Sequence, residues 1–281
     1  MTQGNRAGRA NRTAREAGDP REAAMRPIEL KQRLREGRPV LGTMVALCRT
    51  PDVMPVVANS GMDFALIDTE HGAFTTETVA DLCRAARGAD LTAILRVPGR
   101  GPTHVSRSLD IGANGLMMPR IETADEAAEV IRWAKYAPLG NRGLALGGAA
   151  HDYGPVPDPH TTMAATNEAT VILIQIESQE AVGRIDEIAA VPGLDVLLIG
   201  PMDLSQTLGV PGQLEHPDVI AAMREVVRAG REHGVASGTH SPTIDQCRFW
   251  REEGMTFLAC SSEVGMIRSG LGNLRRTFEE D

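Results

Sequence analysis

The sequence predicts a single α/β domain of the (β/α)8 class, the TIM barrel, and three observations support this prediction. The length of 281 residues is one that such barrels take as one domain. From Pro27 onward, short apolar runs alternate with amphipathic helical segments, which is typical of βα units around a parallel sheet. There are eight such apolar runs, and eight is the number of parallel strands that closes into this barrel. A doubly wound open sheet is the alternative, but no GxGxxG follows the first run.

The eight runs are the expected strands, because most are rich in the Val, Ile, Leu and Met side chains that a buried parallel strand carries. In chain order they are residues 40–47, 64–70, 92–97, 115–121, 171–177, 196–200, 235–239 and 256–260. Turn-forming residues separate elements at Asn59-Ser60-Gly61, Pro192-Gly193 and Glu253-Gly254.

Amphipathic segments between the strands are the expected helices. In chain order they are residues 76–87, 124–136, 179–189, 217–233 and 243–253. Their apolar residues recur three and four positions apart, which places them on the one helix face that packs on a sheet. The segment between the fourth and fifth strands, residues 135–170, is too long for an ordinary connection. We expect it to be an active-site or subunit-contact loop.

Residues 1–26 carry almost no large apolar side chain, so they bury too little surface to offset the entropy of ordering. We expect a disordered arm there and a barrel domain over residues 27–281. The arm lacks the apolar stretch of a secretory signal, and its acidic residues disfavour an organelle transit peptide. The four cysteines are far apart and show no CxxC spacing, so we expect reduced thiols in a cytoplasmic protein.

Composition and charge exclude several classes of function. The net charge is −8, and the basic residues alternate with acidic ones instead of forming a stripe, so we expect no nucleic-acid partner. No stretch approaches the roughly 20 apolar residues of a membrane helix, so we expect no membrane partner. The two lysines, Lys31 and Lys135, fall in helical patterns and not at strand ends, which disfavours Schiff-base chemistry. An acidic chain of this kind usually acts on small molecules.

Polar residues end otherwise apolar strands, and in a barrel this is the end at which catalytic groups collect. Gln175 and Glu177 are two residues apart and project to one face of the fifth strand, while Asp203 follows the adjacent sixth strand. Glu177 and Asp203 can share a divalent ion, and oxygen-only ligands favour Mg²⁺, Mn²⁺ or a similar ion over structural zinc. The alternatives are that Asp203 caps a helix and that Glu177 pairs with an arginine across the barrel mouth.

The second and third strands also end in polar residues. His71 follows Asp68-Thr69-Glu70, and it leaves a core strand among other polar groups, so we expect it to transfer protons. Arg96 ends the third strand, and its fixed charge and five donors suit an enolate or a carboxylate.

These residues stand in a series of motifs that runs in order from about Lys31 to Gly270. The motifs are LGTMVALCRTPDVMPVVANSGMDFALIDTEHGAFTTETV, LRVPG, SLDIGANGLMMPRIETADEA, YAPLGNRG, ILIQIES and DVLLIGPMDLSQTLGVPG. Together they closely resemble the HpcH/HpaI aldolases, the metal-dependent class II pyruvate aldolases. Such a chain of motifs is highly specific.

The resemblance implies a (β/α)8 barrel assembled as a homo-oligomer, typically a hexamer, whose last helix packs against a neighbouring subunit. It implies a divalent metal ion, Mg²⁺, Mn²⁺ or Co²⁺, held by Glu177 and Asp203. It further implies that Gln175 contacts the substrate and that the backbone N–H groups of Met202 and Asp203 bind the substrate carboxylate.

The resemblance also implies roles for the other strand ends. Arg96 would stabilise the enolate, His71 would be the general base or acid, Asp110 in SLDIGA would raise its basicity, and Asp68 would assist its orientation. The implied reaction is the reversible aldol cleavage or condensation of a 2-oxo acid, through the pyruvate enolate, with an aldehyde.

Other functions stay open at this point. The same scaffold resembles that of oxaloacetate decarboxylases and of citrate-forming synthases, and a noncatalytic barrel that binds a 2-oxo acid is the remaining alternative. Met202 stands where relatives carry a small residue, and residues 144–153 depart from the family pattern. The aldehyde partner is therefore open.

Overall fold

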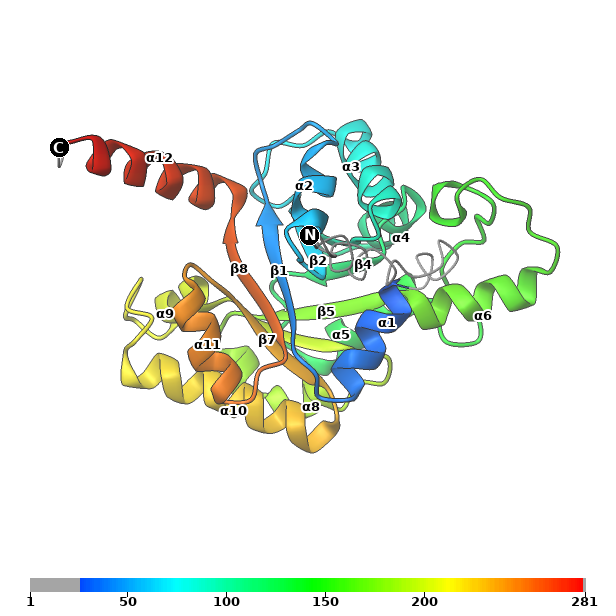
Figure 1. The fold of residues 1–281 in the computed structure, drawn as a ribbon. Helices are drawn as coiled ribbons and strands as arrows, with labels where there is room; N and C mark the ends of the chain where they lie inside the picture. Colours follow the sequence, from blue (N-terminus) through cyan, green and yellow to red (C-terminus); the bar gives the residue numbers. More distant parts are fainter. Residues whose placement is uncertain (1–25, 280–281) are drawn as a thin grey trace, which may run out of the picture.

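A computed structural model describes residues 26–279 of the chain, in which eight parallel strands close into a barrel (Figure 1). The strands are β1 (Val40–Val45), β2 (Phe64–Asp68), β3 (Thr92–Arg96), β4 (Gly115–Met118), β5 (Val171–Ile176), β6 (Val196–Ile199), β7 (Ala236–Ser241) and β8 (Phe257–Ser262). Each pairs with the next, and β8 pairs with β1. The predicted fold class is therefore confirmed, and each strand begins within one residue of its predicted start.

Helices surround the barrel. They are α1 (Arg26–Arg35), α2 (Val53–Asn59), α3 (Thr76–Gly88), α4 (Pro102–Asp110), α5 (Ala124–Ala134), α6 (Pro159–Ala169), α7 (Gln179–Gly183), α8 (Ile185–Ala189), α9 (Pro201–Thr207), α10 (Pro217–His233), α11 (Ile244–Glu252) and α12 (Glu263–Glu279), with a short 3₁₀ helix, η2 (Ala149–His151). The helix predicted over residues 179–189 is two helices, because Arg184 (φ −117°, ψ 17°) leaves the helical conformation. The disorder predicted for residues 1–26 falls almost entirely on residues 1–25, which lie outside the described part of the chain.

Short polar side chains cap several of the helices that follow the strands. The side chains of Thr75, Thr123, Ser178 and Thr243 accept hydrogen bonds from backbone N–H groups in the first turns of α3, α5, α7 and α11. These bonds satisfy donors that the start of a helix leaves free. Each cap therefore fixes where the chain turns from a strand end into a helix.

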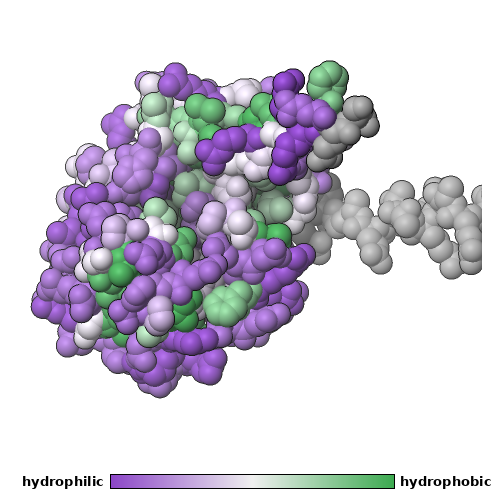
Figure 2. Space-filling view, turned by 90° about the vertical axis from the view of Figure 1, so that its left-hand side faces the viewer, coloured by the Kyte–Doolittle hydropathy of each residue, from purple (hydrophilic) through white to green (hydrophobic). Residues whose placement is uncertain are grey.

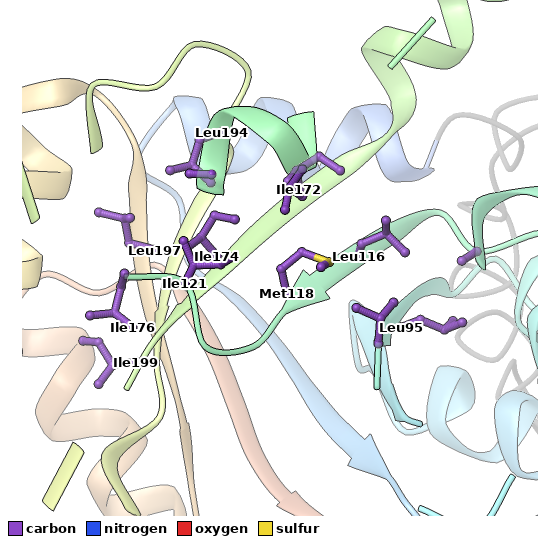
Figure 3. Packing of buried hydrophobic residues seen from close by; sticks show 14 of the residues in the cluster. Leu95, Leu116, Met118, Ile121, Ile172, Ile174, Ile176, Leu194, Leu197 and Ile199 are labelled. Atoms are coloured by element: carbon purple, nitrogen blue, oxygen red, sulfur yellow. The ribbon is translucent and has the colours of Figure 1, made fainter. Parts of the chain in front are cut away.

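The apolar residues form two layers, one inside the barrel and one between strands and helices. On β5, Ile172, Ile174 and Ile176 belong to the outer layer (Figure 3), whereas Val171 and Leu173 belong to the inner one. Since side chains alternate along a strand, the same alternation directs Gln175 and Glu177 toward the barrel axis. The core thus decides which way the polar residues at the strand end point.

The long segment over residues 135–170 joins the end of α5 to the start of β5, so it lies at the amino-terminal ends of the strands. The Nζ atoms of Lys31 on α1 and of Lys135 both donate to the carbonyl oxygen of Thr170, at 3.1 and 2.8 Å, and Lys31 pairs with Asp195 just before β6. Within one chain, the expectation that this segment is an active-site loop is therefore wrong, because helices return the chain to the end opposite the mouth. The alternative, a subunit contact, stays a prediction.

The last helix leaves the barrel. Figure 1 shows α12 extending away from the end of β8, and its apolar side chains Leu271, Leu274 and Phe278 are exposed. The view in Figure 2 shows a mostly hydrophilic surface with a few hydrophobic patches. Among the helices of residues 26–279, none is long and apolar enough to cross a membrane.

Candidate active site

A layer of four inward-pointing side chains lies just beneath the carboxyl-terminal mouth of the barrel. Met44, Arg96, Gln175 and His240 come from the alternate strands β1, β3, β5 and β7, as is usual for a layer in this fold. They line a cavity of about 420 Å³ that also contacts Met117, Leu198, His71, Met202 and Asp203. A cavity of this size suits a small molecule.

Arg96 is held by a carboxylate that the sequence assigned to another role. Its Nε and Nη2 atoms donate to Oδ1 and Oδ2 of Asp68, at 2.8 and 2.7 Å, and both side chains are largely buried. Burial alone would raise the pKa of Asp68, but the hydrogen bonds and charge of Arg96 bring it below its usual value. Asp68 meets His71 through the backbone, since the His71 N–H donates to its Oδ1 at 3.2 Å. The structure therefore joins Asp68 to the arginine and not to the imidazole ring.

Glu70 lies at the centre of the charged groups at the mouth, although the sequence reasoning gave it no role. Its carboxylate is 3.5 Å from Nη1 of Arg96, 3.8 Å from Nε of Arg120 and 4.0 Å from Nε2 of His71. The sequence contained a signal for this residue, because in the predicted strand over residues 64–70 Glu70 is two positions from Asp68, a spacing that places both on one face.

His71 and Asp110 do not meet within one chain. His71 stands at the rim, with 64% of its side chain exposed, and the carboxylate beside its ring belongs to Glu70. Asp110 ends α4, which runs from the mouth toward the amino ends of the strands, and its Oδ1 accepts from Nη2 of Arg142 at 2.5 Å. The assistance that Asp110 was expected to give His71 is not formed inside a single chain.

Glu177 is a buried carboxylate with two strong hydrogen bonds. Its Oε1 accepts from the backbone N–H of Arg120 and its Oε2 from Nε2 of Gln175, both at 2.6 Å. Burial raises the pKa of Glu177 to about 7, and the negative charges of Asp203 and Glu70 act in the same direction. Glu177 has no arginine side-chain partner among the described residues, so the pairing considered from the sequence is not formed.

Asp203 lies in the first turn of α9 and does not cap that helix. Gly200 occupies the cap position, without a side-chain bond. A Cβ atom on Gly200 would lie 2.7 Å from Nε2 of Gln175 and 3.0 Å from Oε2 of Glu177. Glycine at position 200 therefore leaves the Gln175–Glu177 pair its space beneath the start of α9, the helix that carries Asp203.

The donors at this rim fit a hard divalent cation. Glu177 and Asp203 line a second cavity of about 290 Å³, which shares His71 and Asp203 with the first. The raised pKa of Glu177 means that its negative charge is under-compensated, and Oε1 of Gln175 is enclosed without a hydrogen-bond partner. Among residues 26–279, no group of three or more His, Cys, Asp or Glu side chains lies close enough together to bind a metal ion with protein ligands alone. The arrangement suits an ion that completes its shell with water or substrate oxygens.

Comparisons with known proteins agree with this geometry. Residues 44–269 match the family described as HpcH/HpaI aldolase/citrate lyase. The 5-keto-4-deoxy-D-glucarate aldolase of Klebsiella pneumoniae is 33% identical over 257 residues, covering 92% of this chain and 99% of that protein. A crystal structure of an HpcH/HpaI aldolase from Desulfitobacterium hafniense DCB-2 has a TM-score of 0.86 and 35% identity, over 90% of this chain and 97% of that one. The citrate synthase SbnG has a TM-score of 0.80 and 30% identity, over 89% and 97%.

Proposed function

Because this chain belongs to the HpcH/HpaI aldolase/citrate lyase family, we propose that it is a divalent-metal-dependent carbon–carbon lyase. Its reaction is the reversible aldol cleavage or condensation of a 2-oxo acid, such as pyruvate, with an aldehyde. The observation that carries the proposal is that two adjoining cavities at the mouth join the buried carboxylate Glu177 and Asp203 to the fixed cation Arg96.

Glu177 and Asp203 would hold the ion, Mg²⁺, Mn²⁺ or Co²⁺, because both carboxylates line the same cavity at the rim. When bound, such an ion acts as a Lewis acid that stabilises negative charge on a keto oxygen. Gln175 contributes by orienting Glu177, since its Nε2 donates to Oε2 of that carboxylate.

Arg96 supplies a fixed positive charge to the keto oxygen as it becomes an enolate oxygen. Asp68 and Glu70 hold the guanidinium in place, so no reorganisation is needed during the reaction. The loss of one such donor typically slows an enzyme by roughly 10²–10³-fold. The backbone N–H groups of Met202 and Asp203, in the first turn of α9, would receive the substrate carboxylate.

His71 is the proposed proton-transfer group for the aldol hydroxyl. Its exposed position at the rim lets it reach the carbonyl of an incoming aldehyde, and a general acid or base contributes roughly 10²–10⁴-fold. The exposed apolar residues of α12 are suited to contact with a second copy of the chain, which supports a homo-oligomer.

The test measures deuterium uptake into the methyl group of pyruvate in D₂O, with Mn²⁺ or Mg²⁺ and after exhaustive chelation. We expect metal-dependent exchange, lost in Glu177→Ala and Asp203→Ala but kept in Asp186→Ala, which removes an exposed carboxylate remote from the mouth. Full exchange after chelation would overturn the metal assignment.

A second candidate is a citrate-synthase-like enzyme or a decarboxylase that uses oxaloacetate, favoured by the likeness to SbnG. Incubation of pyruvate and oxaloacetate with a panel of aldehydes, followed by mass analysis of the products, separates these reactions. A noncatalytic 2-oxo-acid-binding barrel would give neither product nor exchange.

A further inference from the structure

The inner layer of the catalytic cavity contains a histidine that the proposed reaction has not used. His240 lies on β7, and its half-buried ring lines the same cavity as Arg96, Gln175 and Asp203. Met44, Met117, Leu198, Leu214 and Pro242 give the cavity walls around it an apolar character. A polar ring in such a place is costly unless its nitrogens find partners.

One nitrogen of His240 is fixed by an unusual piece of backbone. Nε2 lies 2.9 Å from the carbonyl oxygen of Ser261 on β8. Ser261 has a φ of 56°, a left-handed conformation that a serine adopts at a cost in free energy, and the pairing of β1 with β8 shifts register between Gly42 and Met44. Strain of this kind concentrates at functional sites. Here it presents a carbonyl to the imidazole.

This contact sets the state of the other nitrogen. A carbonyl only accepts hydrogen bonds, so Nε2 of His240 must carry the proton, and in the neutral ring Nδ1 then holds a free lone pair. Burial lowers the pKa of His240, and the charge of Arg96 acts in the same direction, whereas the hydrogen bond to the Ser261 carbonyl and the charge of Asp68 oppose it; the pKa is lowered on balance, which favours the neutral ring. Among residues 26–279, Nδ1 of His240 has no hydrogen-bond partner. It is also not fully buried, so a small molecule can reach it. The lone pair therefore faces the cavity.

The position of His240 relative to the proposed metal ligands indicates which part of a substrate it meets. Gln175 on β5 and His240 on β7 flank β6, whose end carries Asp203. Strands two places apart are separated by about 10 Å. The proposed partners of the carboxylate and keto oxygen come from β3, β5 and the start of α9, so His240 on β7 lines a side of the cavity that is left for the remaining carbon of a three-carbon acid.

We propose that His240 selects the nucleophilic substrate: its Nδ1 accepts a hydrogen bond from a hydroxyl group on C3, so that a 3-hydroxy-2-oxo acid is preferred over pyruvate. This inference rests on the proposed function and names the class of 2-oxo acid for that site. A carboxylate on C3 offers no donor to the neutral ring and would require a protonated imidazole, which burial, the largest influence on the pKa of His240, disfavours.

The experiment compares hydroxypyruvate with pyruvate in the wild type, His240→Leu and His240→Gln. Leucine removes the acceptor but fills similar space. The Thr43 hydroxyl, 2.9 Å from the Cys260 carbonyl and 3.3 Å from the Ser261 carbonyl, remains beside the oxygen that loses the imidazole. Glutamine retains a polar acceptor. His160→Leu, on exposed α6, is the matched control. Three quantities are measured for both acids with Mn²⁺: deuterium exchange at C3 without aldehyde, kcat/KM with a common aldehyde, and Kd by calorimetry.

We expect the wild type to favour hydroxypyruvate by about tenfold or more, as the loss of one well-placed hydrogen bond implies. His240→Leu should remove this preference in exchange, kcat/KM and Kd, while pyruvate changes by less than about threefold, and His240→Gln should restore part of it. Equal losses for both acids in His240→Leu, or no preference in the wild type, would overturn the inference alone. A preference for oxaloacetate that depends on His240 would also overturn it. Absence of exchange and turnover with every acid would overturn the proposed function itself.

Discussion

Replacement of Asp68 by asparagine tests whether the arginine at the mouth depends on its buried partner. The substitution keeps one oxygen, which can still accept the backbone N–H groups of Glu70 and His71. It removes the charge and places an amide N–H₂ group opposite one arm of the Arg96 guanidinium, where an oxygen accepts at 2.7 Å. The buried Arg96 guanidinium then keeps only one of its two hydrogen bonds to the side chain at position 68.

The size of the effect follows from burial. Breaking a buried ion pair by removing one partner typically costs about 3–5 kcal/mol. The Asp68 and Arg96 side chains are 3% and 11% exposed, so this range applies, and the Glu70 carboxylate at 3.5 Å retains part of the balance. We therefore expect the free energy of unfolding to fall by about 3 kcal/mol. We also expect kcat/KM to fall by about 10²-fold, because a misplaced arginine stabilises an enolate less well.

Urea unfolding followed by circular dichroism measures the stability, and deuterium exchange into pyruvate measures the catalytic effect. Asp186→Asn is the matched control, because Asp186 also forms two bonds to one arginine, Arg228, but on the exposed surface. Exposed pairs contribute little, so this control should change stability far less. If the two variants lost the same stability, burial of the Asp68–Arg96 pair would not be the cause and the reasoning would be refuted.

Three further predictions concern the metal rim and the opposite end of the barrel. The pKa of Glu177 is raised to about 7 in the metal-free protein, so protons compete with the ion near and below that pH. Calorimetry should show Mn²⁺ affinity falling by roughly fifteenfold in all from pH 7 to pH 5.5, as competition by one proton implies. Constant affinity over this range would contradict the prediction. The same raised pKa means that Glu177 favours the metal-free fold below about pH 4.5 and that this contribution is lost as the pH rises through 7. Gly200→Ala places a Cβ atom 2.7 Å from Nε2 of Gln175. We expect this substitution to weaken Mn²⁺ binding at least tenfold without changing the circular dichroism spectrum. Unchanged Mn²⁺ binding would contradict the role given to Gly200. Lys31→Met removes the ion-pair partner of Asp195, which is 12% exposed and lies 3.0 Å from Nζ of Lys31. Urea unfolding should show that the free energy of unfolding falls by roughly 3 kcal/mol, while kcat is unchanged because the pair lies at the end of the barrel opposite the active site. A loss of kcat with unchanged stability would contradict this prediction.

Sequence periodicity was sufficient to place several residues of the site. Alternation along the fifth strand put Gln175 and Glu177 on one face, and the structure joins them by a hydrogen bond of 2.6 Å. The adjacent strand brought Asp203 to the same rim. These predictions needed only the period of a strand and the order of strands in a barrel, which are local properties of the chain.

His240 shows where this reasoning ended. The predicted seventh strand stopped at residue 239, whereas β7 extends to Ser241, and the difference of two residues hid the histidine. Its partner, the Ser261 carbonyl, becomes available only through the left-handed conformation of that serine beside the register shift of β8. No local pattern in residues 235–241 specifies that contact.

The sequence by itself determined the eight-stranded barrel and the polar residues that end its strands, because hydrophobic periodicity and turn residues act over a few neighbouring positions. Only the tertiary structure decided how the charges pair: Asp68 with Arg96, Glu70 beside His71, and Asp110 with Arg142. Most of these pairs join residues far apart in the chain. Their geometry depends on strand register, on helix direction and on the exclusion of water, which arise once the barrel has closed.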